Sequence, residues 1–356
     1  MKITRRMKRE SNFEVLRTIA MFFIVVYHCL THGVGDEYGF NVASIASLSN
    51  VLFSDFMLVF SSVAVNLYVM ISGYFLSDKD FKPSRIVRIW VSACFYSCVI
   101  TIIFMVIQIT PVDMISLGKS IFPLSTDAYW FVTQFIGLLI LSPFLTMIVR
   151  QISYRQYLFL LVAGAFLCLS IIPDFPLAKR FHVAHGNSVW SFAYLFLIAG
   201  FIKRYLRKYP PLRLLLIITL IGLLLLASEM VLGFRNNNIY LYWLNYNGLP
   251  FVLTVFVFMF FRQLVVPDNC FWNLFVKLAP YTFGVYLIHD NLLVRGWLWP
   301  TVSLSTFCDK IYFPLVIMGL CVLLFIVCSL IDAIRKKLFV LCRIDALITK
   351  VDKWSF

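Results

Sequence analysis

Residues 13–28 read FEVLRTIAMFFIVVYH, an apolar run that contains Arg17 and His28. The two residues are eleven positions apart, about three helical turns, so a helix places both on one face and roughly 16 Å apart along its axis. A charged or titratable side chain inside a membrane is unfavourable unless it faces a protein interior or a water-filled cavity. We therefore expect residues 13–28 to lie in a membrane-spanning helix whose Arg17–His28 face carries chemistry.

The composition predicts an all-α polytopic membrane protein. Hydrophobic residues make up 61% of the chain and charged residues 13%, whereas soluble domains carry about 25% charged residues. The first apolar run is longer than the core of a signal peptide and lacks a small-x-small cleavage site, so we expect it to remain as the first span. Apolar runs near the spanning length of about 20 residues predict about ten spans, near 13–33, 54–76, 87–109, 128–149, 157–174, 189–203, 214–233, 248–264, 276–294 and 311–333.

The distribution of basic residues predicts the orientation. With both termini in the cytoplasm, 24 of the 31 Lys and Arg residues lie in inner segments, six lie in outer segments and Arg17 lies within the first span. This excess follows the positive-inside rule. It also accounts for the net charge of +14 without a nucleic-acid partner, because the basic segments border anionic lipid.

The sequence predicts a single membrane domain over residues 1–334. Residues 335–356 form a second segment in which apolar and basic residues alternate, and we interpret it as a basic amphipathic cytoplasmic tail on the inner leaflet, or as a frayed tail.

Several motifs resemble those of the membrane-bound acyltransferase-3 family. Arg17-x10-His28 stands in the first span within the wider phrase NFEVLRTIAM at 12–21, and the second span ends with SGYF at 72–75. The remaining motifs are Arg85-x-x-Arg88, Trp130-Phe131 and Tyr286-Leu-Ile-His289. The resemblance runs from residue 12 to about 330, and it rests on the order of the motifs and on their positions in the predicted topology rather than on any one of them.

The resemblance implies a stand-alone enzyme of the cytoplasmic (inner) membrane that transfers an acyl group to a hydroxyl. Members of the family usually take acetyl from acetyl-CoA, which implies acetyl-CoA or another acyl-CoA as donor substrate and no bound cofactor. The implied acceptor is an envelope glycan, a polysaccharide or a lipid-linked sugar. The alternative, which the residues leave open, is a transporter or flippase of a glycan or acyl intermediate without transferase chemistry.

His28 and Arg17 are the predicted catalytic residues. A neutral imidazole suits the removal of a hydroxyl proton, so His28 is expected to act as a base or to relay the acyl group; a structural histidine is the alternative. Arg17 lies at the cytoplasmic end, where its guanidinium can hold a phosphate or carboxylate. Glu14, one turn earlier, could instead pair with Arg17.

Arg85 and Arg88 are the predicted acyl-CoA-binding pair. They stand at positions i and i+3 where the third span begins, and two guanidiniums at the positive end of a helix dipole favour an anion such as the pyrophosphate of CoA. The alternative for both is ordinary positive-inside anchoring.

Four further residues are predicted to line an acceptor site or a polar cavity: His289, Asp290, Trp130 and Gln134. Asp290 could orient an imidazole, while Trp130 could equally belong to an interfacial aromatic belt. Residues 240–247 carry an aromatic and amide cluster that suits a sugar. We expect no metal site, although His28-x3-His32 and His182-x2-His185 have spacings that metal sites use.

Overall fold

The computed structural model describes residues 10–34, 40–41, 47–126, 128–168, 187–236, 238–239 and 248–354. Residues 182, 185 and 240–247 lie outside these ranges. The described residues form helices and one antiparallel pair of two-residue strands, β1 (Phe40–Asn41) and β2 (Asn238–Ile239). The predicted all-α class is confirmed. The longer helices are α1 (Ser11–His28), α2 (Leu48–Ser61), α3 (Ala64–Leu76), α4 (Pro83–Ile107), α6 (Trp130–Gln151), α7 (Tyr154–Cys168), α9 (Val189–Tyr205), α10 (Pro211–Asn236), α11 (Leu249–Gln263) and α15 (Phe313–Leu341).

Shorter helices complete the described chain. They are α5 (Met114–Ser120), α12 (Cys270–Leu278), α13 (Thr282–His289), α14 (Leu292–Val302) and α16 (Ile344–Lys350), together with a π-helical segment, η1 (Cys29–Val34), and three 3₁₀ turns, η4 (Ala279–Tyr281), η5 (Leu304–Phe307) and η6 (Val351–Trp354).

Six helical segments of the described chain are long and apolar enough to span a membrane, which confirms a polytopic membrane protein. They are Ser11–Val34, Leu48–Leu76, Pro83–Ile107, Trp130–Gln151, Pro211–Ser228 and Phe313–Leu341. Shorter apolar helices, α7 and α11 among them, coincide with further predicted spans.

The predicted ninth span, 276–294, is divided among four short elements, α12, η4, α13 and α14. Two residues explain the breaks. Pro280 lies in η4, where it cannot donate the backbone hydrogen bond of a continuing α-helix. Asn291 starts α14, because its side chain accepts a hydrogen bond from Leu293 N at 3.0 Å. The division places His289 at the C-terminal end of α13.

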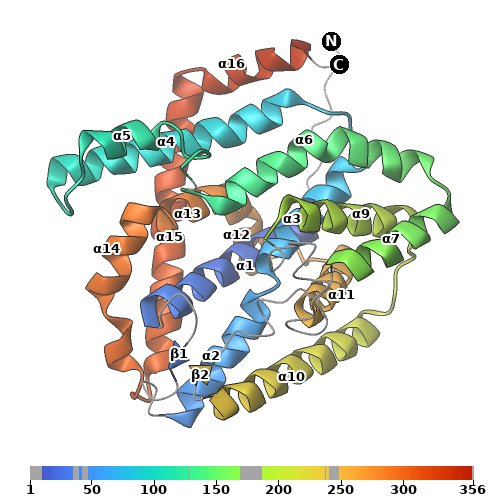
Figure 1. Ribbon diagram of the computed structural model, residues 1–356, viewed down its shortest axis with the longest axis horizontal. Helices are drawn as coiled ribbons and strands as arrows, with labels where there is room; N and C mark the ends of the chain where they lie inside the picture. The colour runs from blue at the N-terminus through green and yellow to red at the C-terminus, as the bar shows by residue number, and fades with distance from the viewer. Residues whose placement is uncertain are drawn as a thin grey trace.

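The first helix occupies the centre of the bundle. It contacts α2, α3, α11, α12, α13 and α15, and it is the most buried of the six long segments. Figure 1 shows α1 surrounded by helices from both halves of the chain. The Arg17–His28 face therefore looks into protein, as the sequence predicted.

The segments predicted to be cytoplasmic meet at one end of the bundle. Asn12 donates to the carbonyl oxygens of Phe261 and Arg262 at 2.9 and 3.1 Å. Lys203 Nζ lies 2.7 Å from Asp78 Oδ2, which joins the end of α9 to the segment after α3. These contacts agree with the predicted topology, in which all of these segments share one side of the membrane.

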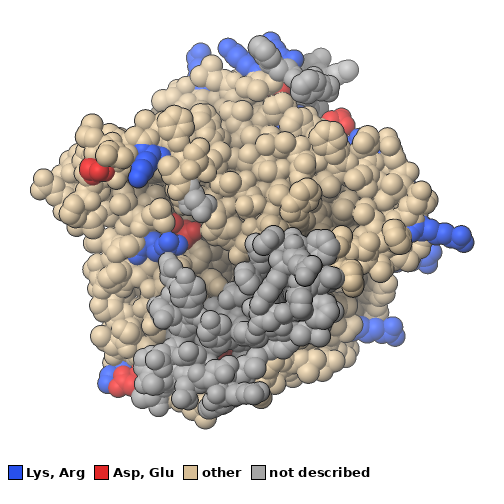
Figure 2. All heavy atoms as spheres, in the orientation of Figure 1, with Lys and Arg blue, Asp and Glu red and all other residues tan. Residues whose placement is uncertain are grey.

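Apolar side chains form much of the outer surface. Leu216, Leu220 and Leu223 are exposed at helical spacing on α10, and Leu323 and Leu330 are exposed on α15. In water such surfaces would be unfavourable, whereas in a bilayer they face lipid. In Figure 2 Lys and Arg side chains are visible along the upper and right-hand margins and on the left-hand side, and most of the described surface on this face is uncharged.

The end of the chain folds back over α4. The predicted domain boundary between residues 334 and 335 lies inside α15, which continues without interruption to Leu341. After Cys342 and Arg343 the chain turns, and α16 and η6 pack against α4. Figure 1 shows α16 running alongside α4 at the top of the view. The last described residues thus reach the helix that carries Arg85 and Arg88.

Candidate active site

His28 lies where the first span changes its helical geometry. It is the last residue of α1, and the chain continues from Cys29 as the π-helical segment η1. Such π-helical turns occur frequently at functional sites, because the wider turn redirects the side chains beside it. The side chain of His28 is 12% exposed, so it lies mostly inside the bundle without being sealed off.

His289 is the direct partner of His28. It is the last residue of α13 and is fully buried. His289 Nε2 lies 2.9 Å from His28 Nδ1, and His289 Nδ1 lies 2.6 Å from the carbonyl oxygen of Val285, one turn earlier in α13. The two imidazoles, 261 positions apart in sequence, thus form one hydrogen-bonded pair.

Asp290 brings a carboxylate to the same pair. Its Oδ1 lies 3.5 Å from His28 Nδ1 and 3.6 Å from Nη1 of Arg295, a residue of α14. Asp290 is buried, whereas the Arg295 side chain is partly exposed. At low effective dielectric, a negative charge at this distance stabilises an imidazolium that forms on His28. The cluster is therefore suited to accept a proton.

A metal ion is a second chemical possibility at this cluster. One ligand atom each of His28, His32 and Asp290 lies within 4.8 Å of the other two. However, the Arg295 guanidinium is already 3.6 Å from the Asp290 oxygen, so a metal cation would meet a fixed positive charge. The arrangement fits acid–base chemistry better, and we assign no metal here.

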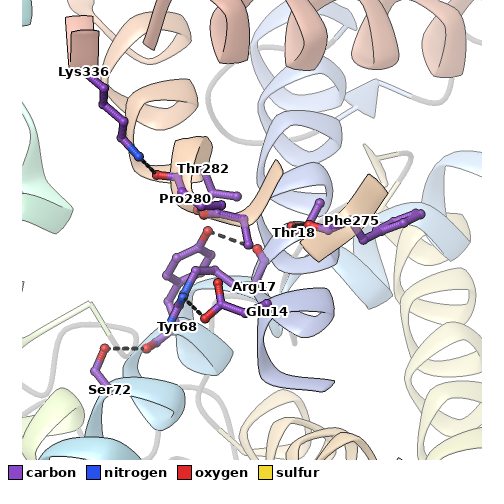
Figure 3. Close-up of polar contacts among 10 residues, drawn as sticks. Glu14, Arg17, Thr18, Tyr68, Ser72, Phe275, Pro280, Thr282 and Lys336 are labelled. Carbon is purple, nitrogen blue, oxygen red and sulfur yellow. Dashed lines mark hydrogen bonds and ion pairs between the residues drawn. The ribbon is translucent and has the colours of Figure 1, made fainter. Parts of the chain in front are cut away.

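Arg17 lies apart from this cluster, at the other end of α1. Its Nη1 donates to Glu14 Oε1 at 2.8 Å, and its backbone carbonyl accepts a hydrogen bond from Tyr68 Oη at 3.0 Å. Figure 3 shows Arg17 and Glu14 beside Tyr68 of α3, with Thr282 of α13 nearby. The pairing with Glu14 that the sequence left open is present. About a quarter of the Arg17 side chain remains exposed, at 27%, so the guanidinium retains access to a ligand.

Arg85 and Arg88 lie at the start of α4, beside the end of the chain. Arg85 Nη1 donates to the carbonyl oxygen of Asp80 at 3.1 Å, and Arg88 Nε lies 3.4 Å from Asp345 Oδ1 of α16. The first turn of α4 is capped by Asp352, whose two carboxylate oxygens accept from Ser84 N and Ser84 Oγ, each at 2.9 Å. These hydrogen bonds lower the pKa of Asp352 below its ordinary value of 3.8.

The comparison with known families agrees with the motifs and with this geometry. The profile of the acyltransferase domain Acyl_transf_3 matches residues 10–333, nearly the whole chain. The chain belongs to this acyltransferase-3 family. No curated protein and no solved structure matches it significantly. Together with the apolar helices, the family shows that the protein is a multi-pass membrane acyltransferase.

In this acyltransferase, a residue that the sequence did not single out, Tyr129, joins the start of α6 to the segment around His289. Tyr129, just before α6, donates to the carbonyl oxygen of Leu287 at 2.9 Å and accepts from Asn291 Nδ2 at 2.8 Å. Trp130, one of the predicted cavity residues, packs edge-on against Phe131 at 6.1 Å. Gln134 lies one turn further along α6 and is partly buried.

The candidate site also contains Arg295 of α14, which the sequence did not single out. Its sequence signal is weak, since it stands just after the predicted ninth span and follows Asp290 by only five residues. The structure identifies it because α14 starts at Leu292, and this helical turn places the Arg295 guanidinium 3.6 Å from the Asp290 carboxylate.

Proposed function

We propose that this acyltransferase moves an acetyl group from cytosolic acetyl-CoA to a hydroxyl of a cell-envelope glycan or lipid-linked sugar, with His28 as the base. The observation that carries the proposal is the hydrogen-bonded pair of His28 and His289 with a carboxylate beside it. The location of the enzyme in the cytoplasmic (inner) membrane belongs to the same proposal.

In the proposed reaction, His28 takes the proton of the acceptor hydroxyl while the hydroxyl oxygen bonds to the acetyl carbonyl carbon. The carbon–sulfur bond of the thioester then breaks, and the CoA thiolate leaves and takes up the proton. A positioned imidazole accelerates such a step by about 10²–10⁴-fold. The charge that develops on His28 is stabilised by Asp290, whose Oδ1 lies 3.5 Å away.

The donor is proposed to bind at the cytoplasmic end. Arg17, Arg85 and Arg88 supply guanidiniums that match phosphate geometry, and the charge distribution assigns that end to the cytoplasm. The thioester would then extend along α1 toward His28, roughly 16 Å from Arg17 at 1.5 Å per residue. Arg17 is thus assigned to donor binding and acyl positioning rather than to the proton transfer.

The acceptor is proposed to approach His28 from the outer side. Arg295 is partly exposed beside the cluster, while Trp130 and Gln134 at the start of α6 offer an aromatic face and an amide, which suit a sugar. This direction of approach keeps donor and acceptor on opposite sides of the base.

The experiment that tests the proposal follows acetyl-CoA in inverted membrane vesicles. Acetyl-CoA labelled in its acetyl group is added outside, and two products are measured: free CoA thiol and label bound to glycan or lipid-linked sugar. The proposal requires equal initial rates of both products, above those of vesicles without the chain. A transporter would neither release thiol nor label glycan, so the absence of both products above the level in vesicles without the chain would contradict the proposal.

A further inference from the structure

We infer that His289 is a positioning residue that fixes the tautomer of His28 and so leaves the Nε2 lone pair of His28 available as the base. The inference rests on the proposed function, because it assigns the ring nitrogen of His28 that takes the proton in the proposed reaction. It is carried by two hydrogen bonds in series: His28 Nδ1 donates to His289 Nε2, and His289 Nδ1 donates to the carbonyl oxygen of Val285.

The first hydrogen bond determines the tautomer of His289. Its Nδ1 lies 2.6 Å from the Val285 carbonyl oxygen. A carbonyl oxygen can only accept, so Nδ1 of His289 must carry the hydrogen. A neutral imidazole has one ring hydrogen, and Nε2 of neutral His289 is therefore an acceptor. The α13 backbone, rather than solvent, imposes this arrangement, because His289 is 1% exposed.

The second hydrogen bond passes this constraint to the base. Since His289 Nε2 accepts, Nδ1 of His28, 2.9 Å away, must donate. Neutral His28 then carries its hydrogen on Nδ1, and the lone pair on Nε2 is available to take the hydroxyl proton. The reverse direction would place the hydrogen of His28 on Nε2 and remove the base. The backbone carbonyl of Val285 thereby selects the catalytically competent tautomer.

The same contact persists after the proton has moved. With the hydroxyl proton on Nε2, His28 is an imidazolium, and its Nδ1–H still donates to His289 Nε2. Asp290, with Oδ1 3.5 Å from His28 Nδ1, offers charge but at more than hydrogen-bond length, so it stabilises the cation without determining the tautomer. Arg295 Nη1 lies 3.6 Å from the same oxygen, so its positive charge partly offsets the negative charge of Asp290.

Three substitutions of His289 separate this role from simple packing. His289→Gln places an amide oxygen near the position of Nε2 and can accept from His28. His289→Asn reaches only the position of Nδ1, and His289→Leu has no acceptor. The matched control is Tyr157→Phe, which removes a buried tyrosine hydrogen bond between α7 and α9, to the carbonyl oxygen of Leu197 at 2.7 Å, and touches no imidazole.

Each variant is assayed in inverted vesicles with labelled acetyl-CoA for kcat and for the KM of acetyl-CoA, and by calorimetric titration of acetyl-CoA into the purified protein in detergent. We expect Leu and Asn to lower kcat by about 10- to 100-fold, the usual effect of losing a partner that orients a functional histidine. The KM and the affinity for acetyl-CoA should stay within about twofold, since donor binding lies at the other end of α1. Gln should restore most of kcat, and Tyr157→Phe should match wild type.

Three outcomes would overturn the inference: wild-type kcat in the Leu variant, a Gln variant as impaired as Leu, or a loss in Tyr157→Phe equal to that in Leu. Failure of the proposed function itself is distinct, because wild-type vesicles would then show no CoA-coupled labelling. A variant that fails to fold is identified by its loss of acetyl-CoA binding. If the Leu variant fails to fold, the inference is tested by the kcat values of the Gln and Asn variants, whose side chains differ by one methylene.

Discussion

Arg88 Nε at the start of α4 lies 3.4 Å from Asp345 Oδ1 of α16, so a residue of the predicted donor site is paired with the end of the chain. Both side chains are about half exposed, and ion pairs of this kind contribute only about 0–1 kcal/mol. A CoA pyrophosphate offers more charge and can engage a guanidinium through two parallel hydrogen bonds. The Asp345 contact is therefore weak enough for the donor to replace it.

Replacing both arginines should weaken donor binding. Arg85→Ala with Arg88→Ala removes two charge-assisted hydrogen bonds, each contributing about 1.5–3 kcal/mol, so the dissociation constant of acetyl-CoA should rise at least about tenfold. Lys at both positions should restore binding only in part, because it retains the charge and loses the planar fork. Calorimetric titration in detergent measures both effects.

The control for this pair is Arg150→Ala, which removes another exposed cation of the predicted cytoplasmic side, paired with Asp80 at 3.5 Å. It should leave acetyl-CoA affinity unchanged. If the double alanine variant binds acetyl-CoA as tightly as wild type, Arg85 and Arg88 are topological anchors only.

Loss of the Asp352 carboxylate should release the end of the chain from α4. Asp352→Asn removes charge-assisted hydrogen bonds to Ser84 N and Oγ, and trypsin should then cut after Lys350 and Lys353 faster than in wild type. Because the pKa of Asp352 is lowered, the stabilising contact is present above about pH 4 and is lost only as the pH falls below that value. Asp345→Asn should have a smaller effect, and equal cleavage rates in wild type and Asp352→Asn would show that the cap does not hold the tail.

Replacement of His28 should separate chemistry from donor binding. In His28→Ala, acetyl transfer in vesicles should be abolished, since the base is gone, while acetyl-CoA should bind with unchanged affinity at the end that carries Arg17. Labelled glycan at the wild-type rate in a well-expressed His28→Ala protein would refute the assignment of His28 as base.

Side-specific thiol labelling tests the predicted orientation. Cys270 and Cys342 are exposed and belong to predicted cytoplasmic segments, so a membrane-impermeant maleimide should reach them only after permeabilisation. In a Cys270→Ser, Cys342→Ser background, His185→Cys should be labelled in intact cells. The opposite pattern would reverse the sides assigned to donor and acceptor.

The close contact between α3 and α9 at Gly73 should be disrupted by a single added methyl group. A Cβ built on Gly73 would lie 2.7 Å from Phe196 Cα, whereas one on Gly319 of α15 would meet nothing within 4 Å. Gly73→Ala should therefore destabilise the protein by about 1–3 kcal/mol, and Gly319→Ala should be neutral or stabilising through helix propensity. Thermal unfolding in detergent, followed by tryptophan fluorescence, compares the two variants. Equal unfolding midpoints would contradict the close packing of α3 against α9 at Gly73.

Much of the architecture was predictable because membrane helices are encoded locally. The first span was predicted at 13–33 and the helix runs from Ser11 to Val34 through η1, since most of its residues are apolar. The division of the predicted 276–294 span was not anticipated. An apolar window hides breaks at Pro280 and Asn291, whose effects depend on local backbone bonding rather than on average hydropathy.

The site was predictable as a set of residues but not as an arrangement. Spacing within one helix placed Arg17 and His28 on one face, because helical geometry is fixed by the backbone. The contact between His28 and His289 joins positions 261 apart, and only the packing of α13 against α1 creates it. Arg295 and Asp345 were hidden for the same reason, as each becomes significant only through a partner on another helix.

In the proposed reaction, one continuous helix carries both the donor anchor Arg17 and the base His28, so the spacing of the two residues would set the length of donor that fits. Covalent geometry, rather than the packing of separate elements, sets the roughly 16 Å between anchor and base at 1.5 Å per residue. On this proposal, a short thioester that lacks the phosphate-bearing half of CoA would reach His28 without being held at Arg17, so we expect the enzyme to favour donors of full CoA length. Inserting one residue between the two would turn one end by about 100° relative to the other and misalign anchor and base together.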